Sequence, residues 1–280
     1  MILRIRYIQE IFFREIKEKS VKTHIFIIGS KGIPASYGGY ETFVDKLTEY
    51  RTNHDIKYHV ACAVDSFKED FEYNGAHCFN ICWKKIGAAR AIFYDWDAFR
   101  YCLRYIEKRK IQNAVIYVLA CRMGPLFYGC VEKAHKLGVK VYVNPDGHEW
   151  LRAKWNRLVR KYWKDSERRM VKHADMLICD SKNIEKYIQE VYKEYKPKTT
   201  FIAYGAETSK SKLKDDEKLM IWYEEKSLES RKYYLVVGRF VPENNYETMI
   251  REFMQSKTDK SLALITNVVD KFLNELKQKT

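Results

Sequence analysis

The sequence contains no apolar run of the roughly 20 residues that a helix needs to cross a bilayer. Its longest apolar stretches have the length of strands, such as Ile25 to Ile28 and Ala114 to Ala120. The first segment, Met1 to Ser20, carries charges among its apolar positions and lacks the small-residue cleavage site of a secretory signal. We therefore expect a cytoplasmic protein that is soluble or peripheral to a membrane.

The seven cysteines form no CxxC pair and no cluster with histidine at the spacing of a zinc site. Most of them lie inside apolar runs, so we expect reduced, buried thiols. The chain has 280 residues, of which 46% are apolar. That is enough to fill a core, which excludes disorder over the whole length.

Acidic residues are fewer than basic ones, and the formal net charge is +14. Such an excess favours an anionic partner, which is a nucleic acid, a phospholipid surface or a nucleotide-diphosphate substrate. Charge alone does not choose among the three. Because the sequence has no basic-aromatic motif typical of nucleic-acid recognition, we expect no nucleic acid as partner.

Short apolar runs alternate with segments of helical period, which predicts an α/β fold with a doubly wound, mostly parallel sheet. The predicted strands of the first domain are His24 to Gly29, Tyr58 to Val64, Val115 to Leu119, Lys140 to Asn144, Met176 to Asp180 and Thr200 to Tyr204. Helical patterns at Ala89 to Arg109 and Pro125 to Leu137 supply crossovers between them.

The composition divides the chain into four parts. Residues 1–20 form an amphipathic extension, which either lies on a membrane surface or packs on the first domain. Residues 21–206 form a Rossmann-like domain, and the lysine-rich segment 207–230 is a linker. Residues 231–280 hold two strand-helix units, Tyr233 to Gln255 and Leu262 to Lys277, which are too few to close a nucleotide-binding sheet. The second Rossmann-like domain is therefore expected to be incomplete.

A glycine-containing loop follows the first predicted strand and leads into a helix. Gly38 and Gly39 precede that helix directly, and the spacing of Gly29, Gly32 and these two glycines does not match a dinucleotide fingerprint. A helix N-terminus reached through glycines offers free N–H groups to a phosphate. The same pattern also fits a tight turn without a ligand, and the residues alone leave both interpretations open.

Three separated blocks, in this order, resemble bacterial rhamnosyltransferases of the retaining, GT-B type glycosyltransferase family 4, with a first domain of the DUF1972 type. The blocks are GSKGIPASYGGYETFVDKL, NPDGHEWLRAKW and VVGRFVPENNYETMI. The resemblance covers nearly everything from Thr23 to the C-terminus. It implies two facing Rossmann-like domains, with the acceptor bound mainly by the first and the donor nucleotide mainly by the second. It also implies that Gly38, Gly39 and Glu41 belong to the substrate-binding residues.

The second block lies just beyond the carboxyl end of a predicted strand, where open α/β sheets bind their ligands. A histidine beside carboxylates can orient sugar hydroxyls and manage protons at a glycosidic oxygen. We therefore assign His148 first and Asp146 second as catalytic residues, with Glu149 as a substrate-binding residue.

The third block places Arg239 directly after the strand Tyr233 to Val237. An arginine there can neutralise the leaving diphosphate through bidentate hydrogen bonds. Related enzymes carry a lysine five positions later that shares the phosphate, and this sequence has Asn244 instead. Arg239 and Asn244 are thus expected to bind the donor, with incomplete charge compensation.

A basic stripe is predicted between Leu151 and Lys172, where Leu151, Trp155, Leu158 and Tyr162 recur at helical spacing among arginines and lysines. Such a face is either a solvated helix surface or a binding surface for anionic lipid headgroups. The second interpretation suits an acceptor attached to a lipid diphosphate.

The resemblance implies transfer of a deoxyhexose, L-rhamnose from dTDP-rhamnose, to a lipid-linked saccharide, without a cofactor or an obligatory metal. The pair Asp95 and Asp97 lies inside a helical pattern, so we interpret it as structural. Relatives continue beyond the segment matching Lys271 to Thr280 with a Glu-rich donor motif. We therefore expect that the polypeptide as given has no measurable donor affinity, and a non-catalytic acceptor-binding or membrane-binding module stays open as the alternative.

Overall fold

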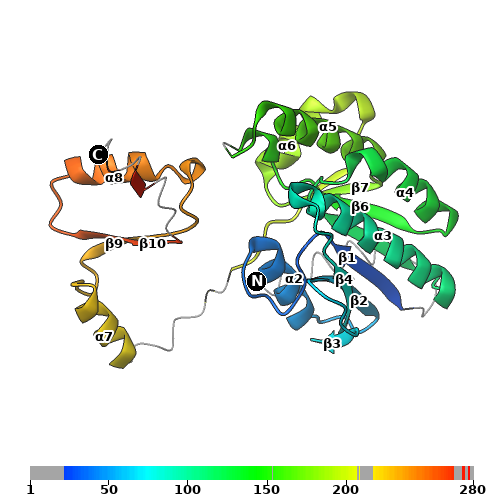
Figure 1. Ribbon diagram of the computed structural model, residues 1–280, viewed down its shortest axis with the longest axis horizontal. Coiled ribbons are helices and arrows are strands. Elements are labelled where there is room, and N and C mark those ends of the chain that lie inside the picture. Colours follow the sequence, from blue (N-terminus) through cyan, green and yellow to red (C-terminus); the bar gives the residue numbers. More distant parts are fainter. Residues whose placement is uncertain are drawn as a thin grey trace. The chain divides into compact units, whose positions relative to one another are not determined.

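The computed structural model describes residues 22–152, 154–206, 208, 217–267, 273–274 and 277. They form two compact units, each with its own sheet (Figure 1). The first unit runs to Leu151 and resumes from Trp155 to the end of the first domain, and the second takes Arg152, Lys154 and the described residues from Thr208 onward. The predicted extension 1–20 lies outside the described residues, as does most of the last predicted helix.

The sheet of the first unit has eight strands in the order β3-β4-β2-β1-β5-β6-β7-β8, and all neighbours are parallel except β3 with β4. Their bounds are β1 Thr23–Ile28, β2 Ile56–Val64, β3 Phe71–Tyr73, β4 Ala76–Cys82, β5 Ala114–Leu119, β6 Lys140–Asn144, β7 Met176–Cys179 and β8 Thr199–Phe201. The strand order reverses between β1 and β5, which makes their junction the topological switch point of the sheet. The α/β fold predicted from the alternating runs is confirmed.

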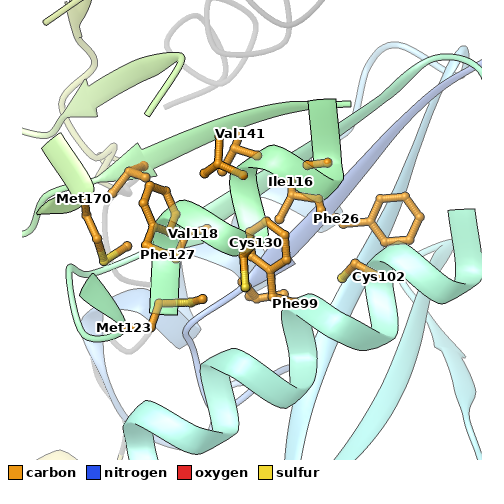
Figure 2. Packing of buried hydrophobic residues seen from close by; sticks show 14 of the residues in the cluster. Phe26, Phe99, Cys102, Ile116, Val118, Met123, Phe127, Cys130, Val141 and Met170 are labelled. Atoms are coloured by element: carbon orange, nitrogen blue, oxygen red, sulfur yellow. The ribbon is translucent and has the colours of Figure 1, made fainter. Parts of the chain in front are cut away.

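Helices cover both faces of this sheet. One face packs against α3 (Arg90–Arg109), α4 (Gly124–Lys136), α5 (Arg157–His173) and α6 (Lys182–Val191), and the other against α2 (Gly39–Glu49). Figure 2 shows the first of these cores, where Phe26, Ile116 and Val141 of the strands meet Phe99 and Phe127 of the helices. Parallel strands that are buried on both faces have continuous apolar sequences, and for this reason β1 and β5 could be predicted from the sequence.

Some elements differ from the sequence prediction. The pair β3 and β4 was not predicted, because polar residues such as His77 and Asn80 interrupt the apolar pattern of β4. The prediction of one helical stripe from Leu151 to Lys172 is wrong, since Glu149–Leu151 form a short 3-10 turn and α5 begins at Arg157 with Asn156 as its N-cap. The caps decide this, because the Asn156 side chain accepts the Val159 N–H at 3.0 Å.

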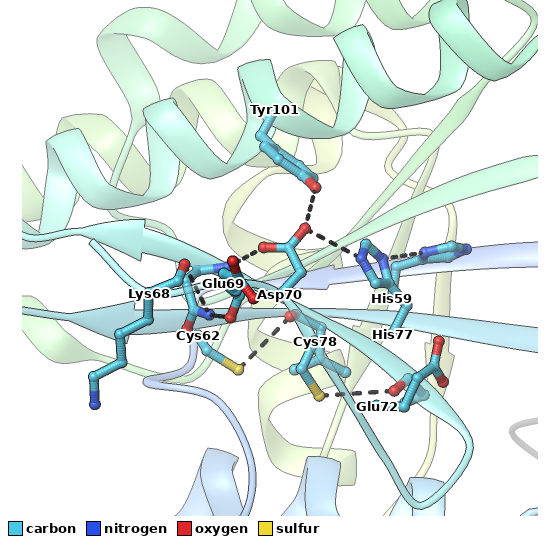
Figure 3. Close-up of polar contacts among 12 residues, drawn as sticks. His59, Cys62, Lys68, Glu69, Asp70, Glu72, His77, Cys78 and Tyr101 are labelled. Carbon is cyan, nitrogen blue, oxygen red and sulfur yellow. Dashed lines mark hydrogen bonds and ion pairs between the residues drawn. The ribbon is translucent and has the colours of Figure 1, made fainter. Parts of the chain in front are cut away.

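A chain of three imidazoles crosses the sheet beneath α3. His24 Nδ1 lies 2.9 Å from His59 Nε2, and His59 Nδ1 lies 3.1 Å from His77 Nδ1. His77 Nε2 lies 3.2 Å from Asp70 Oδ2, which also accepts the Tyr101 hydroxyl at 2.7 Å. Figure 3 shows the Asp70 end of this histidine chain. An ionised carboxylate only accepts hydrogen bonds, so Asp70 fixes a proton on His77 Nε2. The Nδ1 atom of a neutral His77 then accepts from His59 Nδ1, and His59 Nε2 accepts from His24 Nδ1.

The middle imidazole is held in its neutral form. His59 is 2% exposed and stacks on Phe26 with 4.2 Å between the ring centroids. Burial lowers the pKa of His59 to about 2, and His24, His77, Lys57 and Arg109 contribute in the same direction. Burial, together with Lys22 and Lys57, also lowers the pKa of His24. His59 therefore belongs to the packed interior, and its protonation is expected to destabilise the fold.

The second unit is small. Its two parallel strands, β9 (Tyr233–Val237) and β10 (Ser261–Ile265), pack with α8 (Tyr246–Gln255) around Phe240 and Tyr246. The strand β9 has the predicted bounds, and α8 ends at Gln255, where the first predicted strand-helix unit ends. Residues Glu217–Glu225, inside the segment predicted as a linker, form the helix α7.

Candidate functional site

Arg122 ties together the switch point at the carboxyl ends of β1 and β5. Its guanidinium forms a bidentate pair with Asp95, with Nε–Oδ2 at 2.7 Å and Nη2–Oδ1 at 2.9 Å, and it also donates to the Gly29 carbonyl. Asp95 has no exposed surface. Burial lowers the pKa of Arg122, but the Asp95 carboxylate outweighs burial and raises it above its ordinary value. The structural role predicted for Asp95 is confirmed, and sequence reasoning missed Arg122, although it follows a strand end.

Carboxylates of α2 hold the loop between β1 and α2. Glu41 Oε1 accepts the Lys31 N–H at 2.7 Å, and Asp45 Oδ2 accepts the Ala35 N–H at 2.7 Å. Two amides of the loop are thus bonded inside the protein. Glu41 is 9% exposed, and its contact makes it a residue that shapes the loop. Its predicted role in substrate binding stays a prediction.

The two glycines of the loop differ in their surroundings. Gly38 has φ 124°, and a Cβ there would lie 1.9 Å from Glu41 Oε2. A side chain at Gly38 would therefore force the Glu41 carboxylate away from Lys31. A Cβ on Gly39 would meet nothing within 4 Å. The loop thus needs glycine at position 38, while position 39 is open, which the sequence could not distinguish.

The predicted catalytic residues lie in a turn that follows β6. Asn144 Oδ1 accepts the Asp146 N–H at 2.8 Å, and the Asn144 carbonyl accepts the Ala120 N–H at 3.0 Å. Asp146 and His148 both have left-handed backbone angles, with φ 60° and 47°. Such conformations cost free energy in residues other than glycine and gather at functional sites. The structure places both residues at the carboxyl edge of the sheet.

The His148 ring packs against a hydrogen-bonded group of aromatic and charged side chains from α5 and α6. Its ring centroid lies 4.2 Å from that of Tyr187, whose hydroxyl donates to Glu167 Oε1 at 2.5 Å. Glu167 is 4% exposed and also accepts from Tyr192, while Lys164 Nζ lies 3.3 Å from the same oxygen. Four side chains thus fix the plane against which the imidazole packs. Preorganisation of this kind suits a group that must act on a bound substrate.

The Glu149 side chain accepts a hydrogen bond from a residue close to it in the chain. Its Oε1 accepts the indole N–H of Trp155 at 3.0 Å, which links the 3-10 turn to the segment before α5. The contact positions Trp155, and the predicted substrate-binding role of Glu149 stays a prediction.

A group of phenols and carboxylates fills the same edge of the sheet. Asn144 Nδ2 donates to the Tyr204 hydroxyl at 3.0 Å. Burial, with Asp146 and Tyr204 close by, raises the pKa of Tyr40 well above its usual value. Burial also raises the pKa of Asp180, which follows β7. Sequence reasoning missed Tyr40, Tyr204 and Asp180 as site residues. Only the position of Asp180 after a strand end could have signalled it.

The second unit brings its two predicted donor-binding residues together. Asn244 Nδ2 donates to the Arg239 carbonyl at 2.7 Å, and so fixes the loop after β9. The Arg239 side chain is exposed and has no ion pair among the residues that the structure describes. Its guanidinium is available for an anion, whereas the Asn244 amide already serves the backbone.

The basic face of α5 is smaller than the sequence indicated. Arg168 and Arg169 both pair with Asp165, at 2.7 and 2.6 Å. Arg157 and Lys161 are exposed, together with Leu158, which is 79% exposed. Leu151, in the preceding turn, is 54% exposed. Within the described ranges, no helix has the length and apolarity of a membrane span, and no cluster of three metal-ligating side chains occurs.

A family model described as a domain of unknown function, DUF1972, matches residues 22–207, which is more than half of the chain. It covers the whole carboxyl edge of the first sheet, from the glycine loop to Tyr204. No curated protein matches the sequence.

Solved structures of carbohydrate-active synthases share the fold. Sucrose-phosphate synthase from Thermosynechococcus elongatus matches with TM-score 0.62 and 15% identity over 91% of this chain and 66% of its own. The catalytic domain of starch synthase IV from Arabidopsis thaliana, bound to ADP and acarbose, matches with TM-score 0.60 and 11% identity over 92% and 71%. The trehalose-phosphate synthase (UDP-forming) of Burkholderia vietnamiensis matches with TM-score 0.57 and 9% identity over 92% and 69%.

These similarities confirm the prediction of a GT-B type fold, since the matched structures are GT-B glycosyltransferases. Identities this low show the fold alone. The chain spans just under two thirds of the sucrose-phosphate synthase chain.

Proposed function

The chain belongs to the DUF1972 family, and from this premise we propose that it is a glycosyltransferase that takes a sugar from a nucleotide-sugar donor. The observation that carries the proposal is that Arg122 follows β5 while Asp146 and His148 follow the neighbouring strand β6, at the carboxyl edge of a sheet with the GT-B fold. Ligands of open α/β sheets bind at that edge. The ligands named with the matched starch synthase IV, ADP and acarbose, are of the same two classes, a nucleotide and a saccharide.

The finer proposal is transfer of a deoxyhexose, L-rhamnose from dTDP-rhamnose, to a lipid-linked saccharide. The resemblance of the three sequence blocks supports it. Retention of configuration would follow from attack on the same face that the diphosphate leaves, with Arg239 compensating the charge that the diphosphate gains. His148 would orient a hydroxyl of the sugar and hold its proton as the glycosidic bond forms.

His148 is the residue whose change tests this role. Asparagine tolerates the left-handed conformation that His148 adopts, so His148→Asn should fold while removing the imidazole. In a chain extended by the Glu-rich donor motif of its relatives, we expect kcat for transfer from dTDP-rhamnose to a lipid-diphosphate-linked saccharide to fall by about 100-fold or more, with little change in the midpoint of thermal unfolding. His54→Asn, at an exposed position, is the control. Transfer by His148→Asn at the rate of the unaltered protein would remove His148 from the mechanism.

A membrane-binding surface around Leu158 is the second candidate function, because two large apolar side chains are exposed beside Arg157 and Lys161. Anionic lipid headgroups attract such cations, and salt screens the attraction. We expect the protein to sediment with vesicles containing phosphatidylglycerol at low salt and to be released as salt increases.

The vesicle experiment has a matched control. Charge reversal of Arg157, Arg160 and Lys161 should abolish sedimentation, whereas the same reversal of Arg104, Lys108 and Lys133, which are exposed on α3 and α4, should leave most of it. Equal loss in both variants would show that net charge, and not this surface, drives binding. Vesicle binding without turnover by any tested donor would favour a binding module over an enzyme.

A further inference from the structure

Tyr40 carries a buried polar atom that the protein leaves unused. It is the second residue of α2, directly after the glycine loop, and its phenolic oxygen is buried without a hydrogen-bond partner among the described residues. A buried hydroxyl without a partner is unfavourable, and native proteins rarely keep one unless it serves a ligand or an ordered water.

The surroundings of this hydroxyl belong to the candidate site. Asp146, Tyr204, Arg122 and Tyr117 are all close enough to influence the ionisation of Tyr40. The nearby α2 residue Phe43 packs on Tyr204, with 4.9 Å between ring centroids. The phenol therefore points from α2 toward the carboxyl ends of the central strands, on the side where the turn with Asp146 lies.

A second buried donor without a partner lies in that same turn. The indole N–H of Trp150 is buried and has no hydrogen-bond partner within the described part of the chain. Its ring lies 5.9 Å from the His148 ring, centroid to centroid. Two buried donors without a partner among the described residues thus lie near the segment from Asp146 to His148. One is the Tyr40 hydroxyl on α2, and the other is the Trp150 indole in the 3-10 turn that follows His148.

The charges at this edge favour an uncharged ligand. Arg122 is a partly buried cation at this edge, and its guanidinium is bonded to Asp95 and the Gly29 carbonyl. Asp146 and the half-buried Asp180 add negative charge. Carboxylates repel a phosphate but accept hydrogen bonds from sugar hydroxyls, which can themselves accept from a phenol or an indole.

We propose that the phenolic oxygen of Tyr40 binds a hydroxyl group of a neutral sugar. Tyr40 is then a residue of the first unit that determines which sugar binds. The proposal rests on the proposed function, and it assigns the sugar, and not the diphosphate, to the neighbourhood of the Tyr40 hydroxyl. A site built to pair a substrate hydroxyl discriminates strongly against a ligand that lacks it, because the protein group is then left unpaired.

The test compares Tyr40→Phe with Tyr37→Phe, a control that removes a hydroxyl from a 58% exposed tyrosine of the same loop. Binding of the methyl glycosides of rhamnose, glucose and galactose, and of inorganic diphosphate, is measured by saturation-transfer NMR on the full chain. We expect at least one glycoside to bind, Tyr40→Phe to weaken it about tenfold, Tyr37→Phe to leave it unchanged, and diphosphate not to displace it. Without ligand, Tyr40→Phe should unfold at the same or a higher temperature.

Four results would overturn the inference. The first three are an absence of binding by all three glycosides, glycoside binding by Tyr40→Phe as tight as by the unaltered protein, and displacement of the glycoside by diphosphate. The fourth is a lower unfolding temperature of Tyr40→Phe than of the unaltered protein, which would show that the hydroxyl is already bonded within the protein. A transferase assay on the same samples separates the two proposals. Glycoside binding that depends on Tyr40, together with no turnover in a chain extended by the Glu-rich donor motif of its relatives, would refute the proposed function alone. Turnover with an acceptor KM that Tyr40→Phe does not change would refute this inference alone.

Discussion

Replacing Arg122 by alanine should lower the free energy of unfolding of the first unit by about 3–5 kcal/mol, because it leaves the Asp95 carboxylate buried and unpaired. Asp95 has no exposed surface, and the change also removes the donor to the Gly29 carbonyl. Urea unfolding followed by tryptophan fluorescence measures the loss, since five of the six tryptophans, all but Trp222, lie in the first unit.

A double variant provides the control. Arg122→Met with Asp95→Leu removes both charges and keeps apolar volume, so it should recover most of the lost stability. Recovery would show that the single variant suffers from an unpaired charge and not from lost packing. An Arg122→Ala protein within about 1 kcal/mol of the unaltered one would contradict the account of an ion pair that keeps the buried Asp95 compensated at the switch point.

Acid should destabilise the first unit because of His59. The pKa of His59 is about 2 in the folded protein and 6.5 in its ordinary state. Between these values the unfolded chain binds a proton that the folded chain does not. Stability is therefore fully present above pH 6.5 and falls as the pH decreases, by up to about 1.4 kcal/mol per pH unit for this one residue.

Urea unfolding at about pH 7, 6 and 5 measures this slope. The variant His59→Phe, which can still stack on Phe26, should be less stable at neutral pH but should lose part of the acid dependence. The control His54→Asn changes an exposed histidine and should keep the slope of the unaltered protein. An identical slope in His59→Phe would show that another group, such as His24, is responsible.

The strands of the central sheet were predictable because burial on both faces demands apolar side chains at every position. The bounds of β6, which is buried from Val141 to Asn144, follow directly from such a run. The strand β4 was not predictable in this way, since His77 pairs across the sheet with His59 and Asp70 and so occupies a strand position that a polar side chain normally avoids. A compensated polar side chain cannot be recognised before its partners are known.

The candidate site shows the same division. Asp146 and His148 could be named because they follow a strand end. Tyr40 could not be named, because a tyrosine near a helix start has no local signature of a binding group. The loop glycines could be located from the sequence. The sequence could not show that a side chain would collide with Glu41 at position 38 but would meet nothing at position 39.

The sequence by itself determined the α/β class, the strand and helix order and the edge of the sheet where chemistry is concentrated, because these depend on local apolar periodicity and on where strands end. Only the tertiary structure decided how the polar groups pair. It assigned Arg122 to Asp95, Glu41 to the Lys31 amide and Glu149 to Trp155, and among the described residues it left the Tyr40 hydroxyl without a partner. The physical reason is that hydrogen bonds and ion pairs join residues far apart in the chain, and their free energy depends on burial that only packing creates.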